Sequence, residues 1–133
     1  MNWRIAELAH YADAIRWLDA VKARKAYELV LRFDSQSQFG LNQASVQGIE
    51  RLKFGDDEEA GTTWLRSRLP AGQSLVVVFG KTACFKCDVA FFVDNWQDIF
   101  RPGRDDAMVY SEDSSLILFV NHEGGFEVGE RPL

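Results

Sequence analysis

Two cysteines, Cys84 and Cys87, stand three residues apart in the segment 80–96, GKTACFKCDVAFFVDNW, and the chain has no others. A C-x-x-C pair can cycle between two thiols and a disulfide, or it can supply two thiolate ligands to a metal ion. Cysteine is also a small apolar residue that is often buried without a chemical role. The surrounding residues decide among these three interpretations.

A redox site of the thioredoxin-like type places the pair at the start of a helix, after a buried strand. Residues 75–79 fit the strand, but the β-branched and aromatic residues of 88–94 predict another strand rather than a helix. Asp88 would also disfavour a neighbouring thiolate. On a strand, side chains three residues apart point to opposite faces, so Cys84 and Cys87 would share neither a disulfide nor a metal. We therefore predict a structural role and keep a thiol–disulfide redox function as the alternative.

A zinc site built on the cysteines would need two further ligands. The only imidazoles of the chain are His10 and His122, and neither stands in a paired ligand spacing. We therefore expect no metal site and no cofactor.

A second group of reactive residue types lies near the C-terminus: Asp105, Asp106, His122 and Glu123. A histidine titrates near neutral pH and a carboxylate can orient it, so His122 with one of these acids could serve acid–base catalysis. No nucleophile motif, phosphate-binding loop or metal-ligand signature accompanies them. The aspartates can instead accept hydrogen bonds from backbone N–H groups where a strand begins. We assign no catalytic residue, and an enzyme is the less favoured interpretation.

The acids of this region also favour a binding surface. Residues 1–87 carry 12 Lys/Arg and 10 Asp/Glu, a balance of +2, whereas residues 88–133 carry 3 Lys/Arg and 10 Asp/Glu, a balance of −7. Such a balance repels nucleic-acid phosphates and suits a basic protein partner, although a charged surface also serves solubility alone. Aromatic side chains beside the acids can anchor a partner. The candidate binding residues are Trp96, Asp105, Asp106, His122, Glu123 and Glu127.

Length and composition predict one globular domain over residues 1–133, since 47% of the residues are hydrophobic and 13% aromatic. No apolar run reaches the ~18 residues of a membrane-spanning helix. Residues 1–17 carry charges throughout and lack the apolar centre of a secretory signal. We therefore expect a cytoplasmic protein without a membrane partner.

The first half of the chain mixes helical and strand patterns. Residues 3–25 carry apolar side chains at three- and four-residue steps, which predicts a long amphipathic helix. Residues 26–34 alternate between apolar and charged and predict a half-buried strand. A second strand over 44–54 is left undecided by its irregular pattern. The acidic segment 55–61 is a solvated loop or a helix start, and a short helix is expected over 62–69.

The second half is richer in strands. We predict a buried strand over 74–80, a further strand over 89–94, a short helix over 95–100 and a β-meander over 107–130. Because these strands are mainly joined by hairpins, the fold class is α+β. The expected architecture is a mainly antiparallel sheet with the long N-terminal helix packed on it and short helices in the connections. An exposed edge strand would allow a homodimer.

The C-terminal third also resembles a known group of proteins. The spacing W-x-x-x-F-x-P-x-x-D-D, then a hydrophobic strand, then H-E-x-x-F-x-x-G, resembles small bacterial proteins, some of which look like the immunity proteins that accompany secreted or contact-delivered toxins. The residues that carry this resemblance are Trp96, Phe100, Pro102, Asp105, Asp106, His122, Glu123, Phe126 and Gly129. The resemblance implies a compact cytosolic protein that binds another protein, and it brings no catalytic residues.

These observations favour a non-enzymatic protein-binding module, most specifically an immunity protein that neutralises a bacterial toxin by covering it with an acidic surface. A toxin that cuts nucleic acid tends to be basic around its active site, so an acidic partner would associate quickly and occlude that site. A third hypothesis is a small-molecule or peptide binder with a pocket between helix and sheet around His122.

Overall fold

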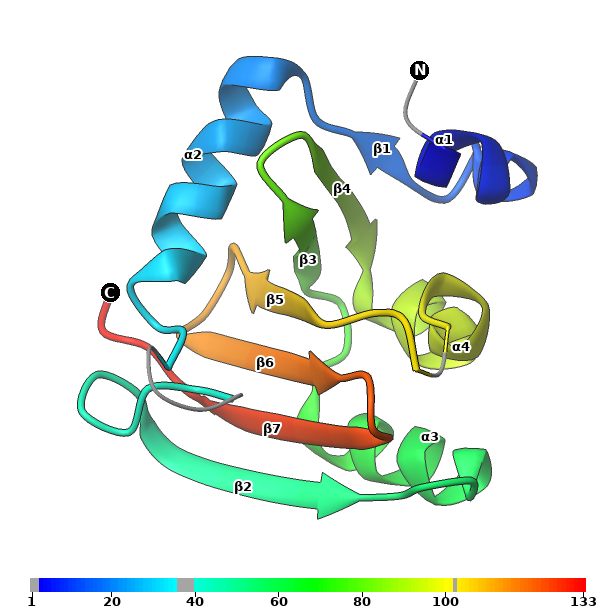
Figure 1. The fold of residues 1–133 in the computed structure, drawn as a ribbon. Helices are drawn as coiled ribbons and strands as arrows, with labels where there is room; N and C mark the ends of the chain where they lie inside the picture. Colours follow the sequence, from blue (N-terminus) through cyan, green and yellow to red (C-terminus); the bar gives the residue numbers. More distant parts are fainter. Residues whose placement is uncertain (1–2, 36–39, 102) are drawn as a thin grey trace.

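An antiparallel sheet forms the centre of the protein in the computed structural model, which describes residues 3–35, 40–101 and 103–133. Its strands are β1 (Arg16–Trp17), β2 (Gln47–Lys53), β3 (Ser74–Gly80), β4 (Ala83–Asp88), β5 (Ala107–Ser111), β6 (Leu116–Asn121) and β7 (Gly125–Glu130). Within the described ranges they form one seven-stranded sheet in the order β1-β4-β3-β5-β6-β7-β2 (Figure 1). All neighbouring strands run antiparallel. The predicted α+β class is confirmed.

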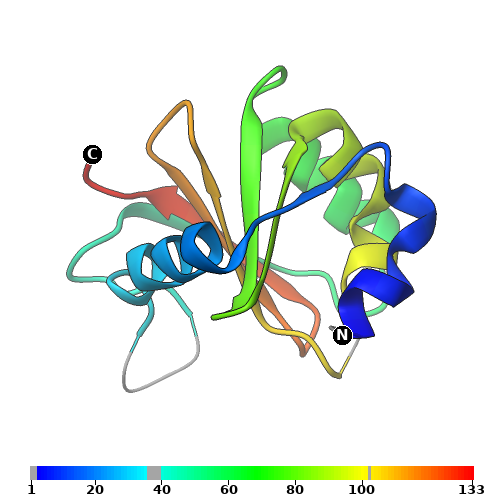
Figure 2. The ribbon, with the colours of Figure 1, turned by 90° about the horizontal axis from the view of Figure 1, so that it is seen from above.

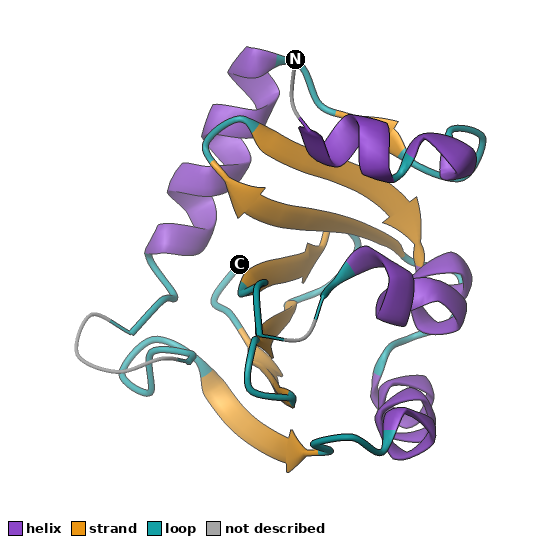
Figure 3. Cartoon of the chain, turned by 45° about the vertical axis from the view of Figure 1, so that its right-hand side comes forward, coloured by secondary structure: helices purple, strands orange, loops and turns teal. Residues whose placement is uncertain are grey.

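Helices cover both faces of this sheet. They are α1 (Trp3–Glu7), the 3-10 helix η1 (Ala9–Tyr11), α2 (Ala20–Leu31), α3 (Glu58–Arg68) and α4 (Val89–Ile99). Helix α2 lies against one face, and α3 and α4 lie against the other with the N-terminal segment beside α4 (Figures 2 and 3). In the part of the chain that the structure describes, no helix combines the length and apolarity needed to cross a membrane.

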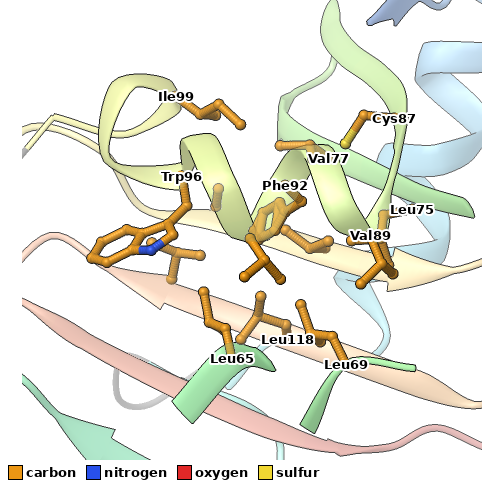
Figure 4. Packing of buried hydrophobic residues seen from close by; sticks show 14 of the residues in the cluster. Leu65, Leu69, Leu75, Val77, Cys87, Val89, Phe92, Trp96, Ile99 and Leu118 are labelled. Atoms are coloured by element: carbon orange, nitrogen blue, oxygen red, sulfur yellow. The ribbon is translucent and has the colours of Figure 1, made fainter. Parts of the chain in front are cut away.

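The hydrophobic core has two halves, one on each face of the sheet, and strand β3 contributes to both. Leu75 and Val77 pack with α3 and α4, whereas Val76 and Val78 pack with α2. All four side chains are buried, because a central strand covered by helices on both faces reads as a continuous apolar run rather than an alternating one. Figure 4 shows the half of the core under α4, where Leu75 and Val77 lie near Phe92.

An aspartate N-cap begins each of the three longer helices. The carboxylates of Asp19, Asp57 and Asp88 accept hydrogen bonds from backbone N–H groups three residues later, at 2.8, 3.0 and 2.7 Å. Such a cap satisfies a donor that the helix leaves without a partner and stabilises it by about 1 kcal/mol. These caps therefore define where α2, α3 and α4 start.

The predicted long helix over residues 3–25 is wrong. The described chain forms the short helices α1 and η1, then turns so that Arg16 and Trp17 pair with β4 as an edge strand. Leu18 continues this contact by donating its backbone N–H to the Cys84 carbonyl at 2.9 Å. The apolar residues do recur at helical spacing, but the pairing of β1 with β4 and the N-cap of α2 at Asp19 prevent one continuous helix.

Two predicted strands are also helical. Residues 26–34 belong to the end of α2 and the turn after it, and residues 89–94 begin α4. In α4 the buried residues follow three- and four-residue steps: Val89, Phe92, Val93, Trp96 and Ile99. A short apolar run fits both periods, and burial against a neighbouring element decides between them.

The other secondary-structure predictions agree with the structure at least in part. The undecided segment 44–54 contains β2, residues 74–80 form β3, and the meander over 107–130 is β5, β6 and β7. The helices expected over 62–69 and 95–100 are the later parts of α3 and α4. Pro102, which belongs to the resemblance pattern, lies outside the described residues.

Candidate binding site

A cavity of about 430 Å³ opens between the start of α3 and the end of α4, beside the turn that joins β6 to β7. We call it the α3–α4 cavity. Its size lies in the roughly 300–1,000 Å³ range of small-molecule sites. Three aromatic residues, Phe54, Trp96 and Phe100, contribute to its lining. The other lining residues are mainly polar or charged.

The loop before α3 is held against the β6–β7 turn by the backbone. The N–H groups of Phe54 and Gly55 both donate to the carbonyl of Gly124 at 3.0 Å. Gly124 has a φ of 86°, and a Cβ there would meet the backbone of Gly55 at 3.0 Å. Only glycine therefore allows this close approach, which sets one side of the cavity.

Trp96 forms part of the wall from α4. Its indole Nε1–H donates to the Thr62 hydroxyl at 2.9 Å, and its ring meets Phe54 edge-on with centroids 5.0 Å apart. Gly61 of α3 leaves room for the ring, since a Cβ there would lie 2.8 Å from it. Trp96 is only 4% exposed, so it is a core residue with one surface on the cavity rather than an exposed anchor (Figure 4).

His122 lines the cavity and is oriented by Asp106. Asp106 Oδ1 accepts hydrogen bonds from the backbone N–H of His122 and from its Nδ1, both at 2.8 Å. The side-chain hydrogen bond to Asp106 and the charge of that carboxylate raise the pKa of His122 above its usual value. With Nδ1 as the donor, Nε2 of the neutral ring is an acceptor.

Asp106 itself lines a separate, smaller cavity of about 150 Å³ against α2, together with Asp34 and Met108. The predicted histidine–carboxylate pair therefore exists, but only His122 contributes to the lining of the α3–α4 cavity.

Asp105 has a structural role in this wall. Its buried carboxylate accepts hydrogen bonds from the backbone N–H of Arg101 and from the Arg104 guanidinium, both at 2.7 Å, and it pairs with Arg4 at 3.1 Å. Burial alone would raise the pKa of Asp105, but the hydrogen bonds from Arg104 and Arg101 and the charge of Arg4 outweigh it and lower the pKa. Glu7 also pairs with Arg104 at 3.0 Å. The network ties the N-terminal segment to the loop after α4.

The last two predicted binding residues lie elsewhere. Glu123 is at the tip of the β6–β7 turn with a 71% exposed side chain. Glu127 lies on the α2 face of the sheet, where it accepts a hydrogen bond from the Leu41 N–H at 2.9 Å and pairs with Arg51 at 3.2 Å. The structure thus places Trp96, Asp105 and His122 in the lining, Asp106 behind His122 and Glu123 on the adjoining turn, and it separates Glu127 from them.

Three lining carboxylates were not singled out from the sequence: Asp56, Glu58 and Asp98. All three are exposed, and among the described residues none forms an ion pair with a lysine or arginine. We call them the carboxylate rim. The run DDEE at 56–59 was a signal, but its place beside the β6–β7 turn depends on β2 pairing with β7.

The other charges of the lining and their partners leave a small positive excess. The Asp105 carboxylate faces Arg4 and Arg104, and Arg101 lies 4.0 Å from Glu7, so three guanidinium groups face two carboxylates. The three carboxylates of the rim outnumber this excess of one, so the mouth of the cavity is negative. Such a site attracts a positively charged group.

The two cysteines lie apart from this site and from each other. Cys87 belongs to the core under α4 and Cys84 to the core under α2, on opposite faces of β4. Both thiols are free and buried. Burial raises the pKa of Cys84 to about 11, and burial with the charge of Asp88 raises that of Cys87 to about 12. This arrangement does not favour the thiol–disulfide alternative.

No group of three or more His, Cys, Asp or Glu side chains is placed to hold a metal ion within the described ranges. Comparison of the sequence with protein-family models and with curated proteins finds no match. The function is therefore inferred from the residues of the α3–α4 cavity.

Proposed function

We propose that this chain is a cytoplasmic, non-enzymatic binding module that uses the α3–α4 cavity and its carboxylate rim to bind a basic region of another protein. The observation that carries this proposal is the combination of aromatic lining with three carboxylates that lack a lysine or arginine partner among the described residues. Aromatic residues supply contact area, and the carboxylates select a positively charged surface.

The spread of acidic residues over several elements around the cavity supports recognition of a protein surface. The rim comes from the loop before α3, from α3 and from α4, and Glu123 extends the same charge onto the β6–β7 turn. A negative patch of this kind steers a basic partner and raises the association rate, with an effect that falls as salt rises.

The most specific form of the proposal is an immunity protein that occludes a toxin. Four residues of the resemblance pattern, Trp96, Phe100, Asp105 and His122, line the cavity, which supports the view that the pattern marks a binding site. A nuclease toxin is basic where it holds nucleic acid, so the carboxylate rim would cover that surface by charge complementarity.

Co-expression tests this function directly. The chain is produced in bacteria together with each toxin domain encoded beside its gene, and survival and binding of the purified pair are measured. We expect survival, and we expect the triple variant Asp56→Asn, Glu58→Gln, Asp98→Asn to associate about tenfold more slowly at low salt. Glu59→Gln is the matched control, because Glu59 is exposed on the same helix turn but does not line the cavity. Absence of both protection and binding would reject the proposal.

A further inference from the structure

We infer that the α3–α4 cavity receives one arginine side chain of the partner, with the guanidinium between the aromatic wall and the carboxylate rim. This inference deepens the proposed function and rests on it, since it names the group that the cavity recognises. It follows from three features of the described residues: the positions of the acceptors, the engagement of the donors and the aromatic lining.

The acceptors come from both sides of the cavity. Asp56 lies in the loop before α3, Glu58 is the first residue of α3, and Asp98 belongs to the last turn of α4. The Tyr11 hydroxyl donates to Asp98 Oδ2, which leaves Oδ1 of Asp98 as an acceptor for a ligand. Both helices pack against the sheet, which fixes the backbone positions of Glu58 and Asp98. A planar guanidinium presents five N–H groups in a fixed fork and can bond to more than one carboxylate at once.

Several nitrogen donors of the lining are already engaged. The Trp96 indole N–H and the Gln97 amide both donate to the Thr62 hydroxyl, at 2.9 and 3.1 Å. His122 Nδ1 bonds to Asp106, whereas the Arg101 guanidinium lies 4.0 Å from Glu7, beyond hydrogen-bond distance. The lining is therefore rich in acceptors, which favours a ligand that brings many donors and no acceptor.

The aromatic wall favours the same group. Phe54, Trp96 and Phe100 line the cavity, and arginine stacks on aromatic rings more readily than other charged side chains. The chain uses this contact itself, since the guanidinium of Arg68 lies 4.6 Å from the centroid of the Trp64 ring. An arginine thus satisfies the charge, the donors and the apolar wall together.

The experiment uses a small probe and its neutral isostere. The ¹⁵N-labelled full chain is titrated with N-acetyl-L-arginine amide and, separately, with N-acetyl-L-citrulline amide, which has the same shape without the charge. The Trp96 indole N–H signal and the Gly55 and Gly124 amide signals report on the cavity. We expect saturable shifts of these signals with the arginine compound, and about tenfold weaker binding of the citrulline compound, since its hydrogen bonds to the rim carboxylates lack the charge on the donor.

Variants then locate the contact. Glu58→Gln is expected to weaken binding of the arginine compound by about two- to fivefold, the range of a partly exposed ion pair. Glu59→Gln should leave it unchanged, and both variants lose the same charge from the first turn of α3. Equal binding of the two probes, shifts confined to other parts of the chain, or equal effects of the two variants would overturn the inference.

The two proposals can fail separately. If the arginine compound binds at the cavity but no basic toxin is neutralised, the proposed function falls and the arginine site stands. If a toxin is neutralised and the triple rim variant slows its association, but Glu58→Gln leaves binding of the arginine compound unchanged, the function stands and the arginine site falls.

Discussion

Asp106 and His122 are joined by two hydrogen bonds to a single carboxylate oxygen, one from the His122 backbone and one from its Nδ1, both at 2.8 Å. Asp106 directly precedes β5 and His122 directly follows β6, so the pair closes the ends of two neighbouring strands. The carboxylate thus orients a side chain of the α3–α4 cavity from the far side of the sheet.

This pair makes stability depend on pH. The folded pKa of His122 is raised above its unfolded value, so the stabilisation is fully present below about pH 6.5 and is lost as the pH rises through the folded pKa. The charges of Asp106 and Glu123 both act on the ring and raise its pKa. We expect His122→Gln to lower the melting temperature more at pH 5.5 than at pH 8.5, relative to the unsubstituted chain.

Thermal unfolding followed by circular dichroism at both pH values measures this difference. His10→Gln is the control, because His10 is exposed and lies outside the pair. An equal loss at both pH values would contradict the assignment of a charged pair.

Removal of the Asp105 carboxylate should destabilise the fold strongly. Asp105→Asn removes the buried counter-charge of Arg4 and Arg104, while Arg104 keeps its ion pair with Glu7. We expect a loss of unfolding free energy above the roughly 1 kcal/mol of an exposed pair and below the about 3–5 kcal/mol of a fully buried one. Because the pKa of Asp105 is lowered, its contribution is present above the unfolded pKa and is lost as the pH falls through the folded pKa.

Urea unfolding at pH 7 gives the free energy of this change. The comparison variant is Asp94→Asn, whose ion pair with Arg66 at 3.5 Å is exposed on both sides and should matter by less than about 1 kcal/mol. Similar losses of unfolding free energy for the two variants would show that burial of Asp105 does not strengthen its ion pairs.

Gly61→Ala should distort the wall of the α3–α4 cavity. The new Cβ would lie 2.8 Å from the Trp96 ring, which the hydrogen bond to Thr62 holds in place. Overpacking of this kind costs about 1–3 kcal/mol, against a gain of up to about 1 kcal/mol in helix propensity. We expect a net loss of stability and a changed Trp96 indole N–H chemical shift.

Gly80→Ala provides the comparison, since nothing lies within 4 Å of its added Cβ and its φ is not positive. Urea unfolding should show little change for Gly80→Ala. If Gly61→Ala were as stable as the unsubstituted chain and kept the Trp96 shift, the close approach of α3 and α4 would be wrong.

The thiols should be unreactive while the chain is folded. Burial raises the pKa of Cys84 to about 11 and, with the charge of Asp88, that of Cys87 to about 12, so neither forms a thiolate at pH 8. We expect Ellman's reagent to modify no thiol of the native protein within an hour and two thiols in guanidinium chloride. Rapid modification of the native protein, or an intramolecular disulfide after mild oxidation, would reinstate the redox alternative.

Local patterns were sufficient for several elements. The meander over 107–130 could be recognised because each of its strands pairs with its neighbour across a short turn. All its pairing partners are therefore close in sequence. The burial of residues 75–78 followed from the Leu-Val-Val-Val run, since a strand covered on both faces carries apolar residues at consecutive positions. The opposite orientation of Cys84 and Cys87 followed from the two-residue period of a strand.

Local patterns failed where two periods fitted the same residues. Residues 89–94 and 26–34 each fitted a strand, and packing made both of them helical. In α4 the decision rests on the Asp88 cap and on burial of Phe92 and Trp96 against the sheet and α3. The helix predicted over residues 3–25 failed in the opposite sense, because part of it is a strand. Arg16 and Trp17 pair with the backbone of β4, and a continuous helix could not form this pairing.

The α3–α4 cavity shows the same limit at the level of the site. His122, Asp105 and Trp96 could be chosen by residue type, and the acidic balance of the C-terminal third was visible in the composition. The rim residues Asp56 and Glu58 come from the other half of the chain and reach the site only because β2 pairs with β7. Contacts between residues so distant in sequence depend on the packing of the whole sheet, and no local period records them.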